Sequence, residues 1–168
     1  MNQAKSHWHR SLELSPRFLD EILDQCRKQL SFAEVLGEVL PGKPSLIFSA
    51  FHKLFAPSEV ARGKAFLEKV VVLLESQAEP LGPAQWHQKA VSHAFLGQVA
   101  AALSSYQAAL DRDPRQADWR LEFGKLLFEQ GLLEKARREL VIVCSERPSH
   151  AEAHNLLALV TRQIAQNR

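Results

Sequence analysis

Histidines and carboxylates are the residue types in this chain that could carry catalysis or hold a metal ion, because both exchange protons and bind cations. His150 and His154 are four residues apart, a spacing that could place both rings on one helix face as metal ligands. His7 and His9 are two apart and would diverge on a helix. His150 falls in an expected turn, and no Cys, Asp or further His stands at a matching spacing. We therefore predict no metal site.

Two pairs of carboxylates are close enough in sequence to suggest acid–base chemistry, Glu13 with Asp20 and Asp111 with Asp113. Both pairs lie near expected helix ends, where charged side chains are ordinarily solvated. The sequence also lacks a G-x-S-x-G turn, a phosphate-binding loop and a Gly-rich dinucleotide turn. We predict a protein that is not an enzyme, with no catalytic residue and no cofactor.

Composition excludes further classes of function. The 21 basic and 19 acidic residues are interspersed and leave a net charge of +2, so no basic stripe suggests nucleic acid. Cys26 and Cys144 show no paired spacing and are expected to be small core residues. No apolar signal core occurs in the first 30 residues, and the run VVVLL is too short to span a bilayer. The default expectation is a cytoplasmic location without membrane insertion.

The elements that must position any functional residue are expected to be helices. Seven glycines and eight prolines fall mostly between periodic segments, and clusters of β-branched residues are few. With 46% hydrophobic residues, the chain can bury a sizeable core. The predicted fold class is all-α.

A period of 34 residues organises the second half of the chain. Residues 83–116 align without a gap on residues 117–150, and residues 151–168 begin a third unit. The aligned positions are Gly97 with Gly131, Ala102 with Ala136, Pro114 with Pro148, and Ala90 with Gly124 and Ala158. Glycine permits the left-handed turn that ends a first helix, small residues permit close helix crossing, and proline ends the second helix.

This pattern resembles the tetratricopeptide repeat (TPR), whose helix–turn–helix units of 34 residues carry such residues at fixed places. Trp86 stands at the usual aromatic position, whereas Trp119 is one place early and His154 substitutes in the third unit. The resemblance covers residues 83–168. It implies a right-handed superhelix of antiparallel helix pairs, with about nine or ten helices in the whole chain.

Residues 1–82 are predicted to form a divergent, repeat-like helical region. The stretch SHWHRSLELSPR superimposes on SSYQAALDRDPR, so residues 1–16 look like the tail of a repeat. A chain that starts and stops inside repeats is expected to be a piece of a longer array, with a Met1 that is not native.

Local signals divide residues 17–82 into helices. Ser31 and Glu34 have the spacing of a capping box, which predicts a helix that ends before Pro41. Apolar residues then recur on one helical face up to Pro57, and a further helix is expected from about Ser58 to Gln77. Gly63 and Pro80 fall in phase with Gly97 and Pro114, but Glu68 replaces the expected small residue and Pro57 interrupts the first helix. This last unit is therefore expected to be repeat-like at best.

The resemblance implies that the first helix of each repeat lines a concave groove. The groove positions of the family can therefore be transferred to this sequence. The predicted partner-binding residues are His87, Val91, Phe95, Leu121, Lys125, Phe128, Glu129, Asn155, Leu159 and Arg162. Such a wall suits an extended or helical peptide with apolar anchors and an occasional acid. The competing interpretation is that Phe95, Leu121 and Phe128 are simply covered by neighbouring helices.

Three functions are compatible with this pattern. The leading hypothesis is a non-enzymatic scaffold that binds a protein or peptide. The second is a regulatory or scaffolding domain of a larger enzyme or envelope-polysaccharide synthesis protein, and the third is self-association as a homodimer through the final helix, Ala151–Gln166. Val91, Glu122 and Glu152 stand where the family's clamp for carboxy-terminal chaperone tails needs polar or basic groups, which disfavours that partner.

Overall fold

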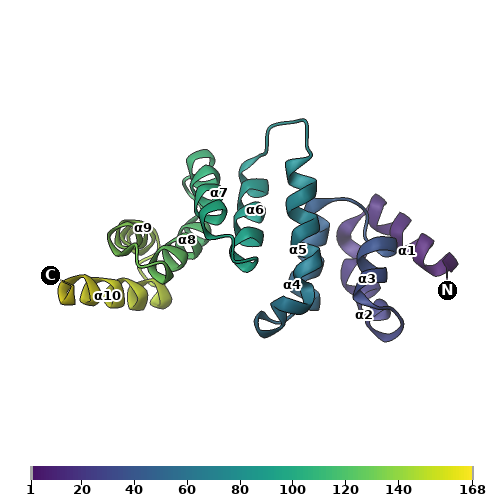
Figure 1. Ribbon diagram of the computed structural model, residues 1–168, viewed down its shortest axis with the longest axis horizontal. Coiled ribbons are helices and arrows are strands. Elements are labelled where there is room, and N and C mark those ends of the chain that lie inside the picture. Colours follow the sequence, from purple (N-terminus) through teal and green to yellow (C-terminus); the bar gives the residue numbers. More distant parts are fainter. Residues whose placement is uncertain (1, 168) are drawn as a thin grey trace. The chain divides into compact units, whose positions relative to one another are not determined.

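A computed structural model describes residues 2–167, without the side chain of Pro57, and in that range it contains ten α-helices and no strand (Figure 1). The predicted all-α class and number of helices are confirmed. The chain forms two compact units: unit 1 runs to Leu81 and includes Phe95–Gly97, and unit 2 comprises Gly82–Ala94 and the residues from Gln98 onward. Met1 and Arg168, the outer limits of the two predicted regions, lie outside the described residues. The repeat boundaries themselves stay a prediction.

Unit 1 is built from short helices, several of which begin at a capping residue or a proline. Ser15 caps a 3-10 turn that has Pro16 at its first position, and Pro44 opens α4. The largest fully buried side chains of this unit include Leu12, Leu23, Ile47, Phe51, Phe66 and Leu67. The elements are α1 (Asn2–Leu14), η1 (Pro16–Phe18), α2 (Leu19–Gln29), α3 (Phe32–Glu34), η2 (Val35–Val39), α4 (Pro44–Leu54), η3 (Pro57–Glu59) and α5 (Val60–Glu75).

The predicted capping box at the start of α3 is confirmed. Ser31 Oγ accepts a hydrogen bond from the Glu34 backbone N–H, and the Glu34 carboxylate accepts one from the Ser31 N–H at 2.9 Å. The segment ends before Pro41, as predicted, but it continues as the π-helix η2, in which the Leu40 N–H donates to the Val35 carbonyl at 2.9 Å.

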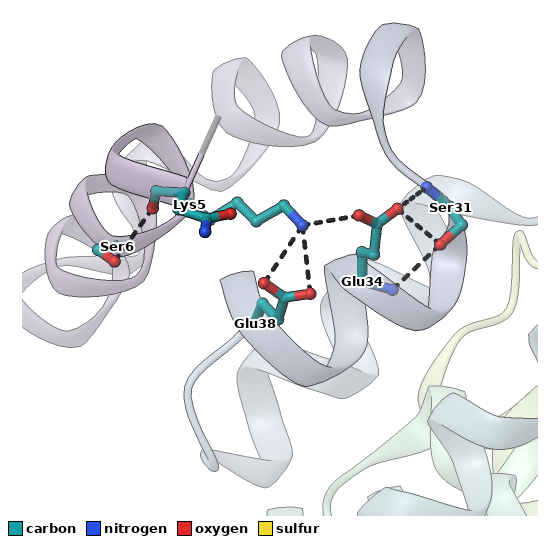
Figure 2. A network of polar contacts seen from close by, with 6 residues as sticks. Lys5, Ser6, Ser31, Glu34 and Glu38 are labelled. Carbon is teal, nitrogen blue, oxygen red and sulfur yellow. Dashed lines mark hydrogen bonds and ion pairs between the residues drawn. The ribbon is translucent and has the colours of Figure 1, made fainter.

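A buried lysine joins α1 to α3 and η2 (Figure 2). The Lys5 side chain is only 8% exposed, and its Nζ lies 2.7 Å from Glu34 Oε1 and 3.2 Å from Glu38 Oε1. The same Glu34 carboxylate also accepts hydrogen bonds from Ser31. Because a buried cation is tolerated when it is paired and hydrogen-bonded, these two carboxylates allow Lys5 to stay charged inside unit 1.

Gly63 differs from the role that its repeat phase suggests. It lies inside α5 and does not end a first helix. A Cβ atom built on Gly63 would lie 2.6 Å from ring carbons of Phe51 and Phe55. The glycine is therefore required for close packing of α5 against the aromatic side of α4, a role that sequence phase does not distinguish from a turn.

Unit 2 contains the periodic helices. These are α6 (Pro83–Phe95), α7 (Val99–Arg112), α8 (Ala117–Glu129), α9 (Leu133–Glu146) and α10 (Ala151–Gln166), and α9 packs against both α8 and α10. Gly97 and Gly131 have φ values of +72° and +71°, so the predicted left-handed turns after α6 and α8 are confirmed.

The small residues of the repeat pattern occupy tight positions where a second helix covers them. Ala90, Ala102 and Ala136 are fully buried, and a Cβ on Gly124 would meet Leu140 at 3.1 Å. Ala158 is exposed instead, because no further helix follows α10 among the described residues. The expected close crossing at Ala158 is therefore absent from this part of the chain.

The two cysteines lie in helices. Cys26 is fully buried in the core of unit 1, as predicted, whereas Cys144 on α9 is half-buried. Burial raises the pKa of both thiols, which disfavours the reactive thiolate. Over residues 2–167, no helix is both long and apolar enough to cross a membrane.

Candidate functional site

The predicted groove residues lie on α6, α8 and α10, the first helices of the predicted pairs. Two side-chain contacts connect these helices in succession. His87 Nε2 on α6 lies 2.6 Å from Glu122 Oε2 on α8, and Lys125 Nζ on α8 lies 2.6 Å from Glu152 Oε1 on α10. We call the surface formed by the predicted residues of these helices within unit 2 the α6–α8–α10 face.

His87 is fixed by aromatic neighbours as well as by Glu122. Its ring stacks on Trp119 at a centroid distance of 4.6 Å and meets Tyr106 edge-on at 5.9 Å. The Tyr106 hydroxyl donates a hydrogen bond to the same Glu122 oxygen at 3.2 Å. Burial, followed by the negative charge of Glu122, raises the pKa of Tyr106, so this hydroxyl remains a neutral donor. These contacts orient His87 within a packed polar cluster.

The second contact is more open to solvent. The side chains of Lys125 and Glu152 are 38% and 60% exposed. The hydrogen bond from Lys125 lowers the pKa of Glu152, so this carboxyl group is ionised at neutral pH. An exposed pair of this kind contributes little stability and can exchange partners with a charged ligand.

The remaining predicted residues divide by exposure. Val91 and Leu121 are buried, with 8% and 5% of their surfaces exposed, so their side chains serve helix packing. Phe128 is half-buried, and the exposed members are Glu129, Asn155, Leu159 and Arg162. A ligand could therefore contact a charged and partly apolar surface. Val91 and Leu121 would pack under this surface without contacting the ligand.

Phe95 is separated from this set. It is 40% exposed and is assigned with Leu96 and Gly97 to unit 1, where its ring lies 5.6 Å from that of Phe51. The structure therefore does not bring Phe95 into the same unit as the other nine predicted residues.

The histidines and carboxylates that could suggest chemistry have separate partners. His150 Nδ1 accepts a hydrogen bond from the Ala153 N–H at the start of α10, and His154 Nε2 lies 2.9 Å from the Pro148 carbonyl oxygen. Asp111 accepts from Gln107, and Asp113 accepts from Gln116. Within residues 2–167, no cluster of three or more His, Cys, Asp or Glu side chains could hold a metal ion.

The partners of His87 and Lys125 were not among the predicted site residues. Trp119, one place early in the repeat, supplies the stacking surface for His87. Glu122 and Glu152, which do not fit the chaperone-tail clamp, are instead the acidic partners of His87 and Lys125. The sequence marks these three positions only by their departure from the family pattern, and that departure is the signal that could have identified them as site residues.

Comparison with known proteins agrees with this architecture. The tetratricopeptide repeat family matches residues 96–160. YrrB, a TPR protein with an unusual peptide-binding site, is 18% identical with a TM-score of 0.57, and the match covers 95% of this chain and 72% of YrrB. MamA is 15% identical with a TM-score of 0.59, over 88% of this chain and 79% of MamA.

The first TPR of Spaghetti (RPAP3), bound to the HSP90 peptide SRMEEVD, is 20% identical with a TM-score of 0.57, over 73% of this chain and 94% of that one. No curated protein matches the sequence significantly. At these identities the structural matches establish the fold. Together with the family match, they show that this chain contains a tetratricopeptide-repeat segment.

Proposed function

We propose that this protein is a non-enzymatic interaction scaffold that binds a protein or peptide segment on the α6–α8–α10 face. The observation that carries the proposal is the succession of three helices, joined by His87–Glu122 and Lys125–Glu152, that presents accessible charged and apolar side chains. Peptide binding by YrrB and by the Spaghetti repeat supports this use of the fold.

The side chains of the α6–α8–α10 face favour a ligand that carries both apolar and acidic groups. Leu159 is 50% exposed and Phe128 is half-buried, which provides apolar contact for an anchor side chain. Lys125 can pair with an acidic group of the ligand if its ion pair with Glu152 breaks. Glu122 and Glu152 would repel a dense cluster of carboxylates, so an acidic chaperone tail is not the expected ligand.

Truncation of Phe128 tests the proposal. A partner is first captured from the source cell and identified by mass spectrometry, and its affinity is then measured by calorimetry. Phe128→Ala should weaken binding by about 1–3 kcal/mol if the ring is an anchor. Lys125→Glu should weaken binding in a manner that depends on salt, and the exposed α9 control Arg138→Ala should have little effect.

Circular dichroism and thermal melting establish whether each variant is folded. If folded Phe128→Ala binds the captured partner with wild-type affinity, the partner uses another surface and the α6–α8–α10 assignment is wrong.

We also propose self-association through α10 as a second function, because this helix has incompletely covered apolar residues. Val160 is fully buried, whereas Leu156, Leu157 and Ile164 are half-buried and Leu159 is 50% exposed. A second copy of the chain could cover this surface.

A further inference from the structure

A cavity of about 510 Å³ opens in unit 1 beside the start of α2 and along α4. Its floor is apolar, formed by Leu12, Leu19 and Leu46, each at most 4% exposed. The volume falls within the range of about 300–1,000 Å³ that is usual for ligand sites. The cavity belongs entirely to unit 1, and none of its lining residues is on the α6–α8–α10 face.

Cationic side chains dominate the rim of this cavity. They are Arg17, Lys43 and Lys53, whereas Asp20 is the single carboxylate among the residues that line the cavity. Lys53 Nζ lies 2.5 Å from Asp20 Oδ1, and Lys43 Nζ donates to the backbone carbonyl of Glu13 at 2.6 Å. The Lys43 and Arg17 charges are not offset by a lining carboxylate, so the rim favours an anionic ligand.

Hydroxyl groups extend the polar rim along α4. Ser45, Ser49 and Lys53 follow one another at four-residue intervals and line the same cavity. At 1.5 Å per residue, this row is about 12 Å long. An extended peptide advances about 3.3 Å per residue, so about four peptide residues match the row. A compact anion such as free phosphate would contact only part of it.

We propose that this cavity binds a short acidic segment of a partner protein. Carboxylates of the segment pair with Arg17 and Lys43, and an aliphatic side chain covers the leucine floor. A carboxylate that approaches Lys53 competes with Asp20, so Asp20 limits the affinity. This second site goes beyond the function proposed for the α6–α8–α10 face.

The test uses the full chain, labelled with nitrogen-15, and two pools of amidated pentapeptides. One pool has glutamate at its second and fourth positions, leucine between them and mixed residues at its ends. The matched pool has glutamine in place of glutamate. We expect the glutamate pool to shift the backbone amide signals of residues 17–20, 43 and 45–53, and the glutamine pool to leave them unchanged.

Three variants assign the effect to the cavity. Asp20→Asn should tighten binding of the glutamate pool about twofold to fivefold, because it frees Lys53, and Lys43→Gln should weaken binding by a similar factor. Lys69→Gln makes the same charge change at an exposed position of α5 outside the cavity and should leave the affinity unchanged.

Several outcomes would overturn the proposal. Equal shifts from the two pools would show that carboxylates are not recognised. Shifts of the same size from inorganic phosphate at equal concentration would show anion binding without recognition of a peptide. Equal weakening by Lys69→Gln and Lys43→Gln would show only a general attraction of charge. Phe128→Ala should leave binding of the glutamate pool unchanged. The test of the cavity is therefore independent of the test of the α6–α8–α10 face.

Discussion

Lys5 shows how a single charged side chain can connect elements that are far apart in the sequence. Its ammonium group contacts Glu34 and Glu38, about 30 residues away, and the π-helix η2 carries the second of these carboxylates (Figure 2). Removing one member leaves a buried charge without part of its compensation, which is more costly than breaking an exposed pair.

The Lys5 cluster predicts acid sensitivity of unit 1. The hydrogen bond from Lys5 lowers the pKa of Glu34 from 4.5 to about 2. Because the folded pKa lies below the unfolded one, this contribution to stability is fully present above pH 4.5 and is lost as the pH falls towards 2. We expect the urea midpoint of unit 1 to fall across this pH range. The backbone amide signals of α1 measure this midpoint.

Glu34→Gln should remove much of that pH dependence, because glutamine does not titrate. Glu68→Gln is the matched control, since Glu68 pairs with Lys64 at 3.4 Å on an exposed surface of α5. An acid dependence that is unchanged in Glu34→Gln would contradict this interpretation.

Two glycines of unit 1 should respond differently to the same substitution. Gly63→Ala places a methyl group against Phe51 and Phe55 and should cost about 1–3 kcal/mol in free energy of unfolding. Gly37→Ala meets no atom within 4 Å inside η2 and should be neutral or stabilising by up to about 1 kcal/mol. Denaturant midpoints measure both, and equal midpoints would mean that the packing around Gly63 is misplaced.

At the scale of helices, the buried alanines of unit 2 define how closely neighbouring elements cross. Ala102→Leu and Ala136→Leu should each overpack a fully buried position and cost about 1–3 kcal/mol. Ala100→Leu adds the same side chain at an exposed position of α7 and should have little effect. Chemical denaturation compares the three variants, and a wild-type midpoint for both buried variants would show that the repeat register is wrong.

The 34-residue period made much of unit 2 predictable. The last helix was expected over Ala151–Gln166 and has those bounds, and both left-handed glycines lie where the period places them. Unit 1 was less predictable, because apolar spacing alone does not distinguish an α-turn from the π-turn of η2. The position of Gly63 inside α5 depends on aromatic rings from another helix, which a local pattern does not encode.

The candidate site was predictable by helix but not by side-chain environment. The repeat phase assigned the residues to α6, α8 and α10. It did not distinguish buried Leu121 from exposed Leu159, because burial depends on which neighbouring helix covers each position. The pairing of His87 with Glu122, 35 residues away, depends on the crossing of two helices and the side-chain rotamers that follow from it.

At the scale of the whole molecule, α10 predicts association that depends on concentration. Sedimentation velocity over about a hundredfold range of protein concentration should show an increasing fraction of dimer, because the apolar surface around Leu159 is incompletely covered. Leu159→Lys should reduce dimer formation. Val141→Lys, at a 49% exposed position of α9, is the matched control and should not. A wild-type chain that sediments as a monomer at every concentration would contradict this prediction.

The burial of Lys5 also makes it a chemical reporter on unit 1. Acylating reagents attack the neutral amine, and the hydrogen bond to Glu34 raises the pKa of Lys5 while the fold covers its side chain. Lys64 and Lys69 on α5 are exposed and provide internal references in the same unit. The rate at which Lys5 is acylated, relative to these two lysines, therefore measures how often α1 separates from α3 and η2 in the native protein.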